Sequence, residues 1–298
     1  MPRWNLCCVS NRLAADGHKF QTMTYKRFAS LPRGEAVAVL SARTLNNIRV
    51  TSKVLEQCAD NNWGYRVSSS LFPLLTYDKA GLDLDSYPDH IEIMETLAGC
   101  SNIVRGKNVR ISCHPDQFNV LAGEGQKQVS RTITELNQHG WLMDVLGGHR
   151  NYLTPINIHV NCTKGAPRDI AARFMHNLSK CDDAVRSRLV VENEDRGIWT
   201  PKLLAQHFDL PITYDNLHHK CLPDGLTEQK AASICYQKWK RNGCDIPIFH
   251  YSESHPDKSN PRTHAEMPTS KPNDYGFSMP VDYDIELKQK DFAIAALD

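Results

Sequence analysis

The stretch PITYDNLHH, residues 211–219, begins as an apolar, β-branched run and ends in an acid and two histidines. The stretch RLVVENED, residues 188–195, repeats this pattern, because its apolar run also leads directly into acidic side chains. In a parallel barrel the carboxyl ends of all strands meet at one mouth, where active sites lie. The two stretches therefore predict a fold and also the place of its chemistry.

The same unit recurs outward along the chain, as short apolar runs separated by stretches with helical periodicity. Strands that alternate with helices indicate parallel βα units, and eight such units predict an α/β fold, a (β/α)8 TIM barrel. We expect one domain over residues 1–298. A doubly wound open sheet is the alternative, but the sequence lacks the G-x-G-x-x-G turn typical of it. The expected strands are 4–9, 63–70, 108–115, 155–160, 188–195, 211–219, 245–256 and 281–289.

Three segments between the expected strands need a separate interpretation. Residues 253–280 carry many Pro, Ser, Asn and charged residues, so we expect a long loop between strands seven and eight. Residues 15–41 show no clear pattern and are interpreted as a loop after strand one. One helix is expected to run through Ile170, Phe174, Leu178 and Val185.

The composition limits the classes of protein to consider. The chain has 35 basic and 34 acidic residues and a net charge of +1, so any nucleic-acid partner must meet a local basic patch. No apolar run is long enough to span a membrane, and the N-terminus lacks the apolar core of a signal peptide. Ten cysteines without C-x-x-C spacing indicate reduced thiols. We therefore expect a cytoplasmic protein, associated with the nucleoid if its source is prokaryotic or viral.

The later six strands each end in a residue type that binds metals. A single histidine or acid at a strand end is usually structural, but a series of them would leave several carboxylates buried without partners. Divalent cations remove that cost, so we predict a metal site. The six residues are His114, His159, Glu192, Asp215, His250 and Glu286.

Two further histidines are candidate ligands. His218 lies one helical turn after Asp215, and His264 lies on the loop after strand seven. His219 has a weaker claim, and His255 is equally compatible with the site and with solvent. Eight ligands exceed the needs of one ion, since zinc and manganese sites use three or four protein ligands. We predict two or three ions bridged by Glu192, an arrangement that suits in-line displacement at phosphorus.

These residues resemble those of a known family. The blocks RISCHPDQF (110–118), IHVN (158–161), VVENED (190–195), DNLHH (215–219), HYSESHP (250–256), RTHA (262–265) and IEL (285–287) together look like the UV damage endonucleases of the UvdE/UvsE group. That group is related to endonuclease IV and has a xylose-isomerase-like TIM barrel. The resemblance covers roughly residues 45–287.

The resemblance implies a DNA repair enzyme. It implies that damaged double-stranded DNA is the partner and that the strand is nicked immediately 5′ of cyclobutane pyrimidine dimers and 6-4 photoproducts, with abasic sites as further candidates and no need for ATP. Manganese is the expected ion, with zinc or magnesium as alternatives. A monomer is expected, because a barrel that binds DNA at one face needs no second copy.

The resemblance also assigns roles by position. His114 and His159 are expected to hold one ion with Glu192. Glu192, Asp215, His250 and Glu286 are expected to hold a second, and His218 with His264 a third. The expected catalytic residues are Glu192, His114, Asp215 and Glu286. Gln117 and Phe118 match a pair that probes the lesion by wedging into the duplex, and Asn11 matches a retained DNA-contacting position.

Three positions depart from the pattern of some relatives. Tyr77 replaces a histidine after strand two, Ile248 replaces a lysine on strand seven, and Cys7 replaces an aromatic residue on strand one. Basic residues near the expected mouth are candidates for phosphate contacts. They are Arg66, Lys164, Arg168, Lys220, Lys258, Arg262 and Lys271.

Two other functions fit parts of the pattern. A metal-dependent sugar isomerase or epimerase uses the same barrel and ligand types, but the number of histidines and the pair Gln117–Phe118 disfavour it. A lesion-binding protein without turnover is compatible with Tyr77 and Ile248. The acidic set Glu192, Asp215 and Glu286 disfavours it, because those carboxylates would repel one another without a metal.

Overall fold

Eight short strands form a parallel sheet in the computed structural model, which describes residues 2–298. The strands pair in the order β6-β5-β4-β3-β2-β1-β8-β7. The two edges of the sheet meet where Asp215 forms a parallel bridge with His250, whose backbone N–H donates to Tyr214 O at 2.9 Å. The predicted TIM barrel is therefore confirmed. The strands are β1 (Trp4–Cys7), β2 (Gly64–Val67), β3 (Ile111–Cys113), β4 (Ile156–Ile158), β5 (Leu189–Glu192), β6 (Ile212–Thr213), β7 (Ile248–Tyr251) and β8 (Asp282–Ile285).

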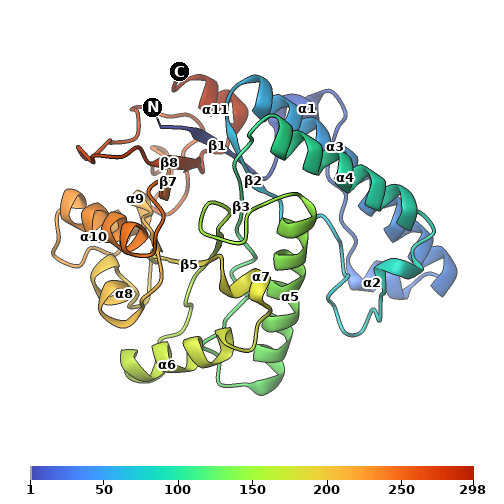
Figure 1. Ribbon diagram of the computed structural model, residues 1–298, viewed down its shortest axis with the longest axis horizontal. Coiled ribbons are helices and arrows are strands. Elements are labelled where there is room, and N and C mark those ends of the chain that lie inside the picture. The colour runs from blue at the N-terminus through green and yellow to red at the C-terminus, as the bar shows by residue number, and fades with distance from the viewer. Residues whose placement is uncertain (1) are drawn as a thin grey trace.

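Helices surround the barrel, and the two ends of the chain lie close together (Figure 1). The indole N–H of Trp4 donates to Asp298 Oδ1 at 3.1 Å, so β1 and the C-terminus are held together. None of the helices within residues 2–298 has the length and apolar character needed to cross a membrane. The helices are α1 (Asn11–Ala15), α2 (Tyr25–Ala29), α3 (Arg33–Asp60), η1 (Leu84–Ser86), α4 (His90–Gly106), α5 (Gln126–Val145), α6 (Pro167–Leu178), α7 (Asp183–Arg186), α8 (Pro201–His207), α9 (Asn216–Cys221), α10 (Glu228–Arg241) and α11 (Asp291–Ala295).

Two of the expected segments were wrong in part. Residues 15–41 are not one loop, because α2 and the first turns of α3 lie within them. The α3 helix begins at Arg33, and its early residues Ala36 and Leu40 are buried, so packing stabilises turns that the sequence pattern does not mark clearly. The helix expected through residues 170–185 is two helices, α6 and α7. The segment 253–280 contains no helix or strand, as expected.

The inside of the barrel is polar below its mouth. Successive strand residues face opposite sides of a sheet, so alternate residues point inward. Asn5 Nδ2 on β1 donates to Asp284 Oδ1 on the neighbouring strand β8 at 2.8 Å. A Cβ atom at Gly64, which pairs with Asn5, would lie 2.0 Å from Asn5 Oδ1. Glycine is therefore required at position 64 for the Asn5 amide to lie inside the barrel.

Candidate metal centre and active site

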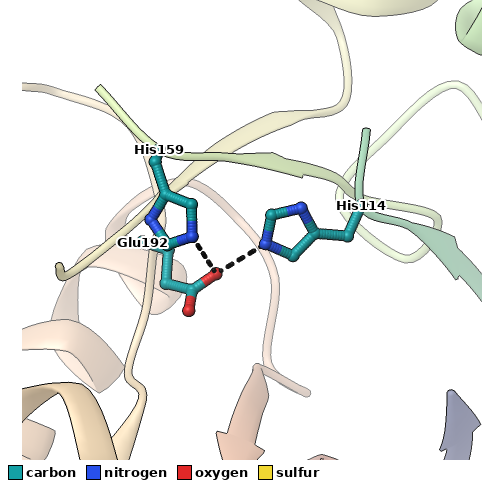
Figure 2. Close-up of side chains that lie close together, drawn as sticks. All are labelled: His114, His159 and Glu192. Carbon is teal, nitrogen blue, oxygen red and sulfur yellow. Dashed lines mark hydrogen bonds and ion pairs between the residues drawn. The ribbon is translucent and has the colours of Figure 1, made fainter. Parts of the chain in front are cut away.

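Glu192, the last residue of β5, lies at the centre of the mouth and is 1% exposed. Its Oε2 lies 3.0 Å from His114 Nε2 and 3.7 Å from His159 Nε2, and the two imidazoles converge on this oxygen (Figure 2). Its Oε1 lies 3.1 Å from His218 Nδ1 and 3.2 Å from His250 Nδ1. One carboxylate thus contacts four imidazoles that come from four different strand ends.

Three groups of side chains in the mouth could hold a metal ion. They are His114, His159 and Glu192; Glu192, Asp215 and His218; and Asp215, His250 and Glu286. Within each group the candidate ligand atoms lie within 4.8 Å of one another. Glu192 and Asp215 each belong to two groups, so their carboxylates could bridge neighbouring ions.

His264 lies beside these groups but in none of them. Its Nδ1 lies 2.6 Å from the backbone oxygen of Glu286 and 4.0 Å from Glu286 Oε2. The structure brings His218 to Glu192 and Asp215, whereas the family resemblance paired His218 with His264. A third ion held by His218 and His264 stays a prediction.

Local structure explains why His218 reaches the mouth. Asp215 is the N-cap of α9, and its Oδ1 accepts a hydrogen bond from His218 N–H at 2.7 Å. This cap turns the first helical residues back over the end of β6. His218 Nδ1 also lies 2.9 Å from Asn193 O, which fixes the ring toward Glu192.

Sequence reasoning missed the polar residues one layer deeper in the barrel. Asn157 Nδ2 donates to Glu192 Oε2, and Asp284 Oδ2 lies 3.5 Å from His250 Nε2. Asn157 precedes His159 by two residues, and Asp284 precedes Glu286 by two. The period of two in β-strands was therefore the signal that could have found them.

Arg66 corrects an expectation. It was a candidate for phosphate contact, but its side chain is 11% exposed and points into the barrel. Its guanidinium contacts Glu286 Oε1 and lies 3.7 Å from Asp284 Oδ2. Position 66 faces the interior because β2 alternates, and the two carboxylates there compensate its buried charge.

The close packing of acids and imidazoles shifts their pKa values. Burial opposes the charge of Glu192, but His250 and His159 outweigh it and hold the pKa of this carboxyl well below its usual range. Burial also opposes the charge of His250, yet Glu192 and Glu286 raise its pKa well above the usual value. Burial dominates at His159 and lowers its pKa to about 4. His159 is therefore neutral near pH 7, as a metal ligand must be.

The unpaired atoms of the site fit a cation. Asp215 is fully buried, and within residues 2–298 no hydrogen bond reaches its Oδ2. Burial is the main cause of the raised pKa of Asp215. A divalent ion would supply the missing partner, and imidazole with carboxylate is a donor set that suits zinc and manganese.

The residues expected to probe DNA lie at the rim. Gln117 and Phe118 are exposed, and the Phe118 side chain is 77% exposed. Phe118 borders a hollow of about 690 Å³, which Tyr77, Lys127 and Arg131 also line. Asn11 is the first residue of α1, and its Nδ2 donates to Lys288 O at 3.2 Å. The DNA-contacting roles of Gln117, Phe118 and Asn11 stay predictions.

Other positions singled out in the sequence are buried, form ion pairs or are exposed. Cys7 and Ile248 are buried, and His219 is buried against Tyr214 with ring centroids 5.7 Å apart. Among the basic candidates, Lys164 pairs with Glu124 at 2.5 Å and Arg262 with Asp195 at 3.0 Å. The remaining basic candidates are exposed: Arg168, Lys220, Lys258 and Lys271.

Comparison with known proteins identifies the family of the chain. A model of the UV-endonuclease UvdE family matches residues 2–298. The chain belongs to the UvdE family. The UV DNA damage endonuclease of Nostoc sp. (strain PCC 7120) is 27% identical over 288 residues, which cover 94% of this chain and 85% of the relative. As a member of this family, the chain is an endonuclease of DNA repair.

Two solved structures extend the comparison. The crystal structure of SacUVDE is 26% identical, with a TM-score of 0.81 and coverage of 100% of this chain and 96% of the other. Endonuclease IV from Thermus thermophilus has a TM-score of 0.59 at 12% identity, covering 99% and 97%. The second likeness shows the fold alone. The expected family is confirmed, and the resemblance that was seen over residues 45–287 extends over almost the whole chain.

Proposed function

We propose that the protein is a metal-dependent endonuclease that nicks a damaged DNA strand immediately 5′ of UV photoproducts. Cyclobutane pyrimidine dimers and 6-4 photoproducts are the proposed lesions, and abasic sites are further candidates. The observation that carries the proposal is the contact of Glu192 with four imidazoles at the mouth. Such a set is suited to two or three divalent ions around one phosphodiester, and manganese is the proposed ion.

The residues of the mouth have different proposed roles according to their position. His114 and His159 with Glu192, and His250 with Asp215 and Glu286, would hold two of the ions. Bound ions would activate water, neutralise the phosphate and stabilise the leaving oxygen. One layer deeper, Asn157 orients Glu192 through a hydrogen bond, and Asp284 Oδ2 lies 3.5 Å from His250 Nε2, so both act as outer partners of the proposed metal ligands.

Lesion recognition is assigned to the rim. An aromatic ring that is exposed in the free protein can replace a stacking partner lost at a distorted base step, and an amide can reach a base edge. Phe118 and Gln117 supply these two groups side by side. Asn11 and the exposed basic residues are proposed to contact the same duplex. We propose that one domain, acting as a monomer, suffices for this task.

Plasmid nicking tests the proposal. Supercoiled DNA, irradiated or untreated, is incubated with the protein in manganese or in EDTA. We expect nicking of the irradiated plasmid alone, abolished by EDTA. Equal nicking of both plasmids would contradict lesion specificity, and full activity in EDTA would contradict metal dependence. If neither plasmid is nicked, an abasic oligonucleotide distinguishes an abasic-site nuclease from a lesion-binding protein or a sugar isomerase.

A further inference from the structure

Two residues near the ligands are not used by the metal groups. Asn161 follows His159 by two residues, and Glu194 follows Glu192 by two. The Asn161 backbone N–H donates to Glu194 Oε1 at 2.7 Å, and Glu194 is 5% exposed. The Asn161 side chain points the other way, and its Nδ2 donates to Gln117 O at 2.8 Å. A chain of two hydrogen bonds thus joins the loops that follow β5, β4 and β3.

The backbone of Asn161 is specialised for this link. Its φ is 48°, in the left-handed region that favours glycine and, among other residues, asparagine. This conformation lets one residue present its N–H to Glu194 and its amide to Gln117. Glu194 is confined in turn by Gly197 (φ 86°), where an added Cβ would lie 3.2 Å from Glu194 Oε2.

Further contacts hold the loop after β4 in place. The Trp199 indole N–H donates to Cys162 O at 2.7 Å, and Arg173 Nη2 donates to Lys164 O at 3.2 Å. The Gln117–Phe118 turn has much less support. Among residues 2–298, Asn161 is the one residue outside the segment 116–119 that forms a hydrogen bond with the backbone of Gln117 or Phe118. Asn161 therefore links the backbone of this exposed turn to the loop after β4, while Val120, which follows the segment 116–119, donates its N–H to Thr132 Oγ1 on α5 at 3.2 Å.

We propose that Asn161, oriented by Glu194, is a positioning residue for lesion recognition. It holds the Gln117–Phe118 turn in the position from which Phe118 can insert into a distorted base step. An immobilised aromatic loses less conformational freedom on binding, so it distinguishes damaged from intact duplex better than a mobile one does. This role rests on the proposed function and assigns a part of the specificity to residues that do not reach the metal groups.

The test uses Asn161→Gly. Glycine keeps the left-handed conformation and the N–H that reaches Glu194, but it removes the amide that holds Gln117. The matched control is Asn62→Gly, because Asn62 also has a left-handed φ, 55°, and lies before β2 at the opposite end of the barrel. Three quantities are measured for each variant: hydrogen exchange of peptides within 115–121, the ratio of Kd values for intact and photoproduct-containing duplexes, and kcat and KM for nicking.

In Asn161→Gly we expect faster exchange in 115–121 and a fall of roughly fivefold in the Kd ratio, the scale of one hydrogen bond. KM should rise and kcat should stay within about twofold, because the metal ligands are unchanged. Asn62→Gly should behave as wild type in all three. Glu194→Gln, which keeps an oxygen acceptor for Asn161 N–H, should restore most of the discrimination that Glu194→Ala loses.

Two outcomes would contradict the positioning role of Asn161 and the proposed function separately. If the wild-type protein distinguishes the duplexes and Asn161→Gly distinguishes them equally well, the positioning role is wrong while the proposed function stands. If the wild-type protein neither nicks photoproduct DNA nor prefers it, the proposed function is wrong and the role of Asn161 falls with it.

Discussion

Asn193 fixes the backbone of Asp215 by two hydrogen bonds. Its Oδ1 accepts from Asp215 N–H at 2.8 Å, and its Nδ2 donates to Asp215 O at 3.0 Å. Both residues are fully buried. Asp215 belongs to two of the three candidate metal groups and caps the helix that carries His218. A single amide on the loop after β5 therefore sets the position of a ligand that follows β6.

Asn193→Asp is expected to destabilise the protein. An aspartate keeps the acceptor for Asp215 N–H but cannot donate to Asp215 O, and it adds a carboxylate to an acidic, buried site. We expect the free energy of unfolding to fall by about 2–3 kcal/mol in urea denaturation. Asn151→Asp is the control, because Asn151 is exposed and its side-chain oxygen accepts from Leu153 N–H at 2.9 Å. Equal stability of the two variants would contradict the stabilising role of the two hydrogen bonds from Asn193 to Asp215.

Glu192→Gln is expected to abolish nicking while sparing DNA binding. The neutral amide would lack the charge that four imidazoles now face, so the centre would lose metal affinity and several kcal/mol of transition-state stabilisation. We expect a loss of roughly 10³-fold in kcat, measured on irradiated plasmid, with an unchanged Kd for duplex DNA. Glu95→Gln, an exposed change of the same type on α4, should leave both quantities unchanged. Normal cleavage by Glu192→Gln would refute the bridging assignment.

Arg66→Met is expected to cost stability that manganese partly restores. The substitution leaves Glu286 and Asp284 buried without their cation, a change that typically costs about 3–5 kcal/mol. An ion that binds Glu286 in the folded state offsets part of this cost, so the urea midpoint should rise when manganese is added.

Arg110→Met is the matched control for this experiment. Arg110 pairs with Asp282 at 2.8 Å with similar burial, but Asp282 begins β8 at the end of the barrel opposite the mouth. We expect Arg110→Met to be destabilised and to gain less from manganese than Arg66→Met. An equal rise of the urea midpoint in both variants would show that manganese stabilises the fold independently of the carboxylates beside Arg66.

The stability of the metal-free protein should fall as pH rises above about 6.5. Glu192 and Glu286 raise the pKa of His250 despite its burial, and Asp215 and Glu192 likewise raise the pKa of His218. A histidine whose pKa is raised on folding stabilises the fold fully below its pKa in the unfolded chain, about 6.5. This contribution is lost as the pH rises through the pKa of the folded protein. The slope can reach about 1.4 kcal/mol per pH unit for each proton released.

Urea denaturation in EDTA between about pH 6.5 and 8.5 measures this slope. Manganese should weaken or reverse it, because metal binding displaces the imidazole protons. His176→Gln, an exposed change on α6, should leave the slope unchanged. Stability that is flat or rising over this range in EDTA would mean that the acids do not hold His250 and His218 in their charged forms.

Phe118→Ala is expected to weaken lesion recognition without affecting the fold. The side chain is 77% exposed, so its loss should change the free energy of unfolding by less than about 0.5 kcal/mol. Affinity for a photoproduct duplex should fall by about 1–3 kcal/mol, the scale of one stacked aromatic, and affinity for intact duplex should change little. Ile91→Ala provides the control, because Ile91 is 74% exposed on α4. Similar losses for both duplexes would exclude a probing role for Phe118.

The positions of the strands and of most candidate ligands could be predicted because their signals are local. An apolar run that ends in His, Asp or Glu marks a strand and its mouth-facing end, and this holds from His114 to Glu286. The start of α3 at Arg33 could not be placed, because its early turns are stabilised by burial of Ala36 and Leu40 against distant segments.

The sequence by itself determined the barrel, the order of the strands and which residue types reach the mouth, because the periodicities of strands and helices are properties of neighbouring residues. Only the tertiary structure decided that Glu192 contacts four imidazoles, that Arg66 is buried against Glu286, and that Asn161 holds Gln117. These relationships join strands and loops far apart along the chain. They depend on closure of the barrel and on the direction of each side chain, which the order of residues does not specify.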